Sequence, residues 1–208
     1  MRVIGVTGGI ASGKSTVTEM LRTSGEVVVC ADSLYHALIA PTAGKPSALA
    51  QKIVVAFPGV LASDGSIDRG KLGSIVYHDP EARRRLGAIT HPAVAQALAD
   101  ALTGYAAQGI ERVFYDVPLL YENKIDVLIP EVIVVWVSPD VQLQRLMVRD
   151  RLNETEARAR INSQMPLDEK RDRATWVIDN SGTIEQTKQQ VVGLIISTFF
   201  ARRATDQL

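Results

Sequence analysis

The residues with the clearest chemical meaning lie near the start of the chain, where residues 8–16 read GGIASGKST. This stretch, which we call the phosphate loop, fits the pattern GxxxxGK[ST] between a strand-like and a helix-like run. Glycines permit backbone conformations that let successive N–H groups point inward around an anion. The lysine and the hydroxyl residue after it can hold outer phosphates and Mg²⁺. The pattern predicts a nucleoside triphosphate site, and the alternative is a chance glycine-rich turn.

Two aspartates end apolar, strand-like runs. Asp116 ends VFYD and is a candidate for supporting the Mg²⁺ shell, although it can equally cap the next turn. Asp32 ends EVVVCAD, and ligands in open α/β sheets bind beyond the carboxyl ends of strands. A carboxylate there can take a proton from an attacking hydroxyl or orient it. The alternative for Asp32 is an N-cap for a helix beginning at Leu34.

Arginines gather between residues 145 and 173, the lid segment. Arg145, Arg149, Arg158 and Arg160 recur at helical spacing, and NETEARAR offers a second helix start. We expect a helical hairpin over the nucleotide that delivers arginine to phosphates and excludes water. A solvated helix pair with exposed ion pairs is the alternative for any single arginine, and Arg149 is the strongest functional candidate.

The elements that must position these residues alternate between strand and helix. Short apolar runs predict five strands, and such alternation favours a parallel sheet covered on both faces. Between the second and third strands we expect helices interrupted by loop signals at FPGVLASDGS and HDPEA. The predicted strands are 3–7, 26–32, 112–120, 131–138 and 174–180, and the main predicted helices are 14–22, 93–108, 139–151 and 184–200.

Composition excludes several classes of protein. The 208 residues are 46% hydrophobic and 22% charged, and 23 basic residues balance 23 acidic ones, so no global charge favours nucleic acid or membrane. Cys30 is the single cysteine, which excludes an internal disulfide and a cysteine-based zinc site. No charged leader precedes the first apolar run, and no apolar stretch is long enough to span a bilayer. We expect a cytoplasmic protein without nucleic-acid or membrane partners, and monomer and homo-oligomer both stay open.

Seven stretches carry a more specific signature than the phosphate loop alone. They are IGVTGGIASGKST (4–16), ADSLYH (31–36), THP (90–92), DVPLLYE (116–122), VSPDVQLQRLMVRD (137–150), RINSQM (160–165) and VIDNSG (177–182). In order and content they resemble the dephospho-CoA kinase family, over nearly the whole chain. Ser33, Leu34 and Tyr121 depart from the family's usual residues.

The resemblance implies an enzyme that transfers the γ-phosphate of ATP to the 3′-hydroxyl of the ribose of dephospho-CoA, the last step of coenzyme A synthesis. Asp32 would act at the acceptor hydroxyl, while Lys14 and Arg149 would stabilise charge during transfer. Mg²⁺ would accompany ATP at Ser15 and Asp116. The implied ATP-binding residues are Gly8, Gly9, Ile10, Ala11, Ser12, Gly13, Lys14, Ser15, Thr16, Arg145 and Asn180, the last of them near the adenine.

The resemblance also implies an acceptor site and a fold. The implied acceptor-binding residues are Asp32, His91, Pro118, Leu119, Tyr121 and Glu122. The alternative for His91 is a cap for a helix that starts at Pro92. The fold would be a three-layer α/β P-loop kinase with a central five-stranded parallel sheet. Its core would comprise 1–33, 110–144 and 174–208, with a helical acceptor-binding insertion at 34–109 and the lid segment at 145–173.

Two other functions compete with this one. A kinase for another small acceptor, such as a nucleoside, a nucleoside monophosphate or shikimate, would share the phosphate loop and the lid. It would differ at ADSLYH and DVPLLYE. A nucleotide-dependent switch would bind or slowly hydrolyse nucleotide without transferring phosphate. No NKxD-type guanine motif follows a strand, since ENKID at 122–126 lies elsewhere, and this argues against a GTPase switch.

Overall fold

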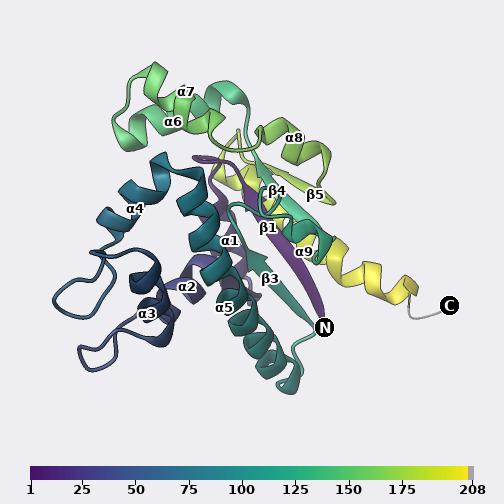
Figure 1. Cartoon of the computed structure of the whole chain (residues 1–208). Helices are drawn as coiled ribbons and strands as arrows, with labels where there is room; N and C mark the ends of the chain where they lie inside the picture. The colour runs from purple at the N-terminus through teal and green to yellow at the C-terminus, as the bar shows by residue number, and fades with distance from the viewer. Residues whose placement is uncertain (206–208) are drawn as a thin grey trace. The chain divides into compact units, whose positions relative to one another are not determined.

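The computed structural model describes residues 1–205, and it describes their side chains except those of His78 and residues 199–205. The chain forms two compact units (Figure 1). One combines Met1–Val28 with the chain from Glu111 onward, and the other is Val29–Ile110. The sequence predicted an insertion at 34–109, and its acceptor-binding role stays a prediction. Residues 206–208 of the predicted core segment 174–208 lie outside the described residues.

A five-stranded sheet forms the centre of the fold, as predicted. Its order is β2-β3-β1-β4-β5, and β1 pairs in parallel with β3 and β4, as β4 does with β5. Strand β1 ends one residue later than predicted, and the other four end earlier: Ala31 already begins a helix after β2, and Pro118 lies just beyond β3. The strands are β1 (Arg2–Gly8), β2 (Val27–Cys30), β3 (Arg112–Asp116), β4 (Val132–Trp136) and β5 (Trp176–Asp179).

Helices α1 (Lys14–Thr23) and α9 (Ile184–Thr205) cover one face of this sheet. Alternate strand residues meet them there in a buried cluster. At the other face, β1 comes so close to its cover that a Cβ on Gly5 would lie 2.5 Å from Leu120 Cδ1. Helix α8 (Leu167–Asp172) packs along β4. Burial of both faces explains why the strands are continuously apolar. The buried cluster contains Ile4, Val6, Val17, Leu21, Phe114, Ile133, Val135, Ile178, Val191 and Leu194.

Polar side chains tie the amino ends of the strands to α9. Arg112 forms an ion pair with Glu26 and donates hydrogen bonds to the Ile195 carbonyl (3.2 Å) and to Thr198 Oγ1 (2.8 Å). Arg2 pairs with Glu131 and donates to the Thr198 carbonyl. These bonds lie at the end of β1 and β3 opposite to the phosphate loop, which follows the carboxyl end of β1.

The lid segment contains parts of three helices. Helix α6 (Pro139–Asp150) begins at Pro139, as the sequence predicted, with Ser138 as its N-cap, and its C-cap residue Arg151 has a φ of 54°. Asn153 starts α7 (Glu154–Asn162) with a capping box to Glu156, and α6 packs against α7. Helix α8 follows α7, and the short 3₁₀ helix η1 (Ile125–Val127) lies before β4.

The Val29–Ile110 unit is helical and has its own core. It contains α2 (Ala31–Ile39), α3 (Ala48–Ala56), α4 (Arg69–His78) and α5 (Pro80–Ala107), and α5 packs against the other three. Ser47 caps α3 and Asp68 caps α4 through their side-chain oxygens. The core includes Ile39, Leu49, Ala50, Ile53, Phe57, Val60, Ile67, Leu72 and Ala82.

Helix α5 corrects two predictions. The sequence predicted a helix from Ala93 with His91 near its start and a loop at HDPEA, but α5 begins at Pro80 with Asp79 as its N-cap. Asp79-Pro80 is a helix-start signal of the same kind as Ser138-Pro139. Pro92 is inside the helix, so His91 does not cap its start. Gly87 lies one turn before His91, and because it has no Cβ it leaves room for the His91 ring.

No helix among the described residues is both long and apolar enough to cross a membrane.

We predict that Arg112→Met lowers the free energy of unfolding by about 2 kcal/mol, because it removes charge-assisted hydrogen bonds from a largely buried site. Chemical denaturation measures the change. Arg22→Met is the matched control: its ion pair with Glu19 is exposed, and we expect a loss of at most about 0.5 kcal/mol. Equal losses in the two variants would contradict the role given to Arg112.

Candidate functional site

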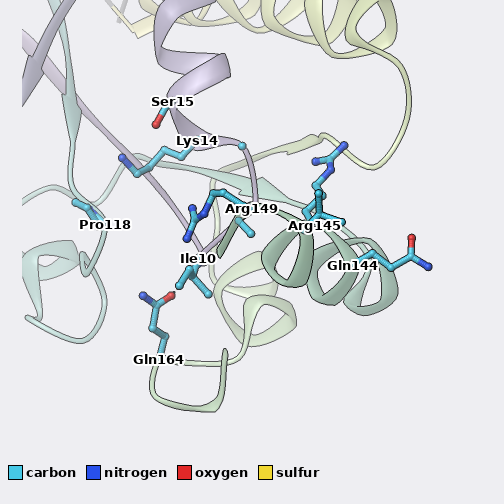
Figure 2. Close-up of a pocket in the computed structure, with 13 residues that line it drawn as sticks. Ile10, Lys14, Ser15, Pro118, Gln144, Arg145, Arg149 and Gln164 are labelled. Atoms are coloured by element: carbon cyan, nitrogen blue, oxygen red, sulfur yellow. The ribbon is translucent and has the colours of Figure 1, made fainter. Parts of the chain in front are cut away.

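A cavity of 720 Å³ lies beside the phosphate loop (Figure 2). The loop forms one wall of the cavity, and residues of α6 form another. The side chain of Arg149 extends toward the loop, while that of Gln144 points away from it (Figure 2). The lining residues are Gly8, Gly9, Ile10, Ala11, Gly13, Lys14, Ser15, Pro118, Gln144, Arg145, Val148, Arg149 and Gln164.

Close contacts explain the glycines of the phosphate loop. A Cβ on Gly8 would lie 2.5 Å from Ser12 Oγ and 2.9 Å from the Val135 carbonyl oxygen. Gly13 has a φ of 84°, and a Cβ there would lie 2.1 Å from Asn180 Nδ2. Helix α1 begins at the next residue, Lys14, so the positive end of the helix faces the loop.

Three side chains hold the carbonyl groups of the loop from outside the cavity. Lys170 Nζ donates to the Gly8 carbonyl (3.2 Å), Gln142 Nε2 to the Ile10 carbonyl (2.9 Å) and Asn180 Nδ2 to the Ser12 carbonyl (2.8 Å). None of the three donors lines the cavity. In a planar trans peptide the C=O and the following N–H point in opposite directions. The three bonds therefore turn the next N–H groups, those of residues 9, 11 and 13, toward the cavity.

Gln164 completes the support of the loop. Its Oε1 accepts a hydrogen bond from the Ile10 N–H (2.9 Å), so glutamine side chains hold both peptide groups of Ile10. Gln142 is 5% exposed, and a Cβ on Gly9 would lie 2.7 Å from its Nε2. The amide of Asn180 is fixed in turn, because its Oδ1 accepts from the Thr187 hydroxyl (2.8 Å).

Cationic side chains surround the cavity. Lys14 forms an ion pair with the buried Asp116, while Arg145 and Arg149 enter from α6. Arg149 also bonds Asp150 (Nε–Oδ1 2.8 Å), and this hydrogen bond raises the pKa of Arg149. The same bond, with help from Arg160, lowers the pKa of Asp150. Arg149 is therefore charged at neutral pH.

Two further arginines of the lid segment, Arg158 and Arg160, make ion pairs outside the cavity. Arg158 pairs with Glu154 one turn earlier (2.7 Å), and Arg160 pairs with Asp150 (2.7 Å). Neither lines the cavity. For these two, the geometry matches the exposed ion pairs that the sequence left open as an alternative.

The two residues predicted to hold Mg²⁺ supply only part of its coordination shell, so a bound phosphate and water must supply the rest. Ser15 presents an exposed hydroxyl at the start of α1, and Asp116 already binds the ammonium group of Lys14. Among the described residues no cluster of three His, Cys, Asp or Glu side chains could hold a metal. Mg²⁺ commonly takes one or two protein oxygens and completes its shell with water and phosphate oxygens. One hydroxyl and one carboxylate beside a phosphate-shaped loop fit that mode.

Four predicted acceptor residues belong to the unit that contains the phosphate loop: Pro118, Leu119, Tyr121 and Glu122. Of these four, Pro118 alone lines the cavity. Tyr121 is buried under the guanidinium of Arg173 (4.3 Å), and burial raises its pKa. Glu122 forms an ion pair with Lys170 (2.8 Å), and its second oxygen is buried without a hydrogen bond. Leu119 is 38% exposed. Their contact with an acceptor stays a prediction.

Asp32 and His91 belong to the Val29–Ile110 unit. Asp32 is an exposed residue in the first turn of α2, whose N-cap is Cys30, so the structure excludes the cap at Leu34 that the sequence left open. His91 is exposed on α5. Of the predicted ATP-binding residues, Ser12, Thr16 and Asn180 do not line the cavity, and Asn180 instead supports the loop from behind.

Comparison with known proteins identifies the family. The dephospho-CoA kinase family model matches residues 2–186. The dephospho-CoA kinase of Anaeromyxobacter dehalogenans is 51% identical, over 89% of this chain and 86% of the relative. The dephospho-CoA kinase of Syntrophotalea carbinolica is 46% identical, over 94% of this chain and 91% of the relative. The chain belongs to the dephospho-CoA kinase family.

Two solved structures have a similar fold. Dephospho-CoA kinase from Campylobacter jejuni has a TM-score of 0.70 and 28% identity, covering 95% of this chain and 98% of the other. A crystal structure from Thermus thermophilus, with 31% identity, has a TM-score of 0.80 and covers 95% and 97% of the two chains. The predicted P-loop kinase fold is confirmed.

Sequence reasoning missed four residues that support the loop of this family member: Gln142, Gln164, Lys170 and Thr187. A signal exists for two of them. Gln142 lies one turn before the buried Leu146, and Lys170 one turn after the buried Leu167, so each is a polar residue on the apolar face of its helix. A polar residue on such a face needs a buried partner, which a sequence alone does not identify.

We predict that Gln142→Leu weakens ATP binding by this dephospho-CoA kinase family member about tenfold, because the Ile10 carbonyl loses its donor and the adjoining N–H its orientation. Isothermal titration in Mg²⁺ measures the dissociation constant. Gln190→Leu is the matched control, since its amide also bonds the backbone, at the N–H and C=O of Asp179 in β5. Unchanged affinity in Gln142→Leu would contradict the role of the loop support.

Proposed function

We propose that this member of the family transfers the γ-phosphate of ATP to the 3′-hydroxyl of the ribose of dephospho-CoA, yielding CoA and ADP. The observation that carries the proposal is the cavity in which the phosphate loop, Lys14, Arg145 and Arg149 meet. Phosphoryl transfer asks a protein mainly to position the reactants and to neutralise charge. The loop N–H groups and three cationic side chains supply both.

Lys14 and the loop hold the phosphates in this proposal. The ammonium group of Lys14 is bound to Asp116 in the structure, and it would exchange this partner for the outer phosphates when ATP binds. The exchange releases the carboxylate of Asp116 for a cation. Arg145 and Arg149 approach from α6 on the opposite side and would neutralise the charge that spreads over the transferred group.

Mg²⁺ would be held by the Ser15 hydroxyl and by Asp116, either directly or through water. When bound, the ion would offset the negative charge of the β- and γ-phosphates. The protein's part is to place the hydroxyl at the start of α1, where the backbone N–H groups also favour phosphate.

Asp32 is our candidate for the residue at the acceptor hydroxyl. It follows the carboxyl end of β2, where ligands of open α/β sheets bind, and its carboxylate is exposed. It would accept the hydroxyl proton or orient the hydroxyl for in-line attack. His91 of the Val29–Ile110 unit, and Pro118, Leu119, Tyr121 and Glu122 of the other unit, stay predicted acceptor-binding residues. The adenine position of Asn180 and the cytoplasmic location stay predictions from the sequence.

An ADP-release assay with ATP, Mg²⁺ and dephospho-CoA tests the proposed reaction. We expect turnover on dephospho-CoA, with CoA confirmed by product mass, and no comparable turnover on adenosine, AMP or shikimate. Turnover on one of these other acceptors alone would contradict the substrate. ADP release that is independent of any acceptor would instead favour a nucleotide-dependent switch.

We predict that Asp32→Ala lowers kcat by about a hundredfold or more, because a positioned carboxylate at the acceptor contributes at least that much. ATP affinity should stay within about twofold of the original. Steady-state kinetics and ATP titration measure the two effects separately. Asp64→Ala, an exposed aspartate in the same unit that only bonds the nearby Ser66, is the control. Turnover near that of the unaltered enzyme would remove Asp32 from the mechanism.

A further inference from the structure

Lys170 is a fully buried lysine on α8, with a side-chain exposure of 0%. Its ammonium group has three hydrogen atoms to donate and meets three oxygens. These are the Gly8 carbonyl (3.2 Å), the Pro118 carbonyl (3.4 Å) and Glu122 Oε1 (2.8 Å). Every donor of the group therefore has an acceptor.

Two of these three oxygens belong to backbone at the cavity. Gly8 begins the phosphate loop after β1, and Pro118 follows β3 and lines the cavity. The Pro118 carbonyl also accepts from the hydroxyl of Thr7, the residue before Gly8 (3.0 Å). Lys170 and Thr7 together fix the distance between the carboxyl ends of the neighbouring strands β1 and β3. Gly8 and Pro118, at these two strand ends, both line the cavity.

The third oxygen belongs to the carboxylate of Glu122, whose negative charge is balanced by the ammonium group of Lys170. Glu122 Oε1 also accepts from the Met165 N–H (3.1 Å), while Oε2 is buried without a hydrogen bond. Taking two charged groups out of water costs several kcal/mol each, and well-packed apolar residues often stabilise such a position equally well. Stability alone thus gives no reason for an ammonium group at this position. The reason lies in the two carbonyl groups beside the cavity, which need hydrogen-bond donors.

We propose that Lys170 is a positioning residue for nucleotide binding. It acts through the backbone: its bond to the Gly8 carbonyl directs the following N–H toward the cavity, and its bond to the Pro118 carbonyl holds the facing wall at a fixed distance. It touches neither nucleotide nor acceptor. The proposal deepens the proposed function and rests on it only for the identity of the nucleotide, ATP.

The test compares Lys170→Met with the double variant Lys170→Met/Glu122→Gln. The single variant leaves the Glu122 carboxylate buried and unpaired, so we expect a lower melting temperature and an ATP dissociation constant raised about tenfold or more. The double variant removes both charges, so we expect most of the melting temperature to return while the dissociation constant stays raised. Glu122→Gln alone keeps both carbonyl bonds and should bind ATP within about threefold of the original. A purely structural lysine would show affinity and stability recovering together.

Arg112→Met is the control for a general loss of stability. Its ion pair with Glu26 is also largely buried, but it lies at the amino end of β3. Titration with ATP and Mg²⁺, well below every melting temperature and without dephospho-CoA, should show unchanged affinity in this variant. The readout needs no phosphoryl transfer, so a failure of the proposed reaction would be seen separately in the ADP-release assay.

Two outcomes would overturn the proposal. One is an ATP affinity in the double variant that equals that of the unaltered protein. The other is the failure of both Lys170 variants to fold while Arg112→Met folds, since Lys170 would then be needed for folding itself rather than for positioning.

Discussion

The site depends on one constraint of the peptide bond. A loop that offers its N–H groups to an anion must turn its carbonyls the other way, and those carbonyls then need donors of their own. Three side chains behind the phosphate loop meet this need, at Gly8, Ile10 and Ser12. The carbonyls are spaced two residues apart, so alternate peptide units are held. The loop is therefore oriented before any ligand arrives, which lowers the cost of binding one.

The three donors come from different parts of the chain. Gln142 lies on α6, Lys170 on α8, and Asn180 directly after β5. Two of them are held by partners of their own: Lys170 pairs with Glu122, and Asn180 bonds Thr187 of α9. The second half of the chain must therefore fold against β1 before the first motif is fully supported.

Sequence alone predicted what depends on local pattern. The phosphate loop, the five strands and the start of α6 follow from glycines, apolar runs and a proline after a cap. The same logic, applied to Asp79-Pro80, would have located the start of α5, but Pro92 hid the continuity of that helix. The sequence did not predict that Gln142 and Lys170 support the loop. A polar residue on an apolar helix face must have a buried hydrogen-bond partner, but the sequence does not identify that partner. The predicted end of β3 is four residues too late because apolar residues continue past Asp116.

The same bonds attach some residues of the lid segment to the loop backbone and leave others without such a bond. Arg145 and Arg149 have no bond to the loop, and the side chain of Arg149 is 55% exposed. Gln164 and Lys170 are bonded to the loop backbone, and Asp168 receives the indole N–H of Trp136 in β4 (2.7 Å). Helix α8 is thus part of the sheet's cover. Any closure over a nucleotide falls to the C-terminal part of α6 and to α7, between the fixed points at Gln142 and Gln164, where the arginines are.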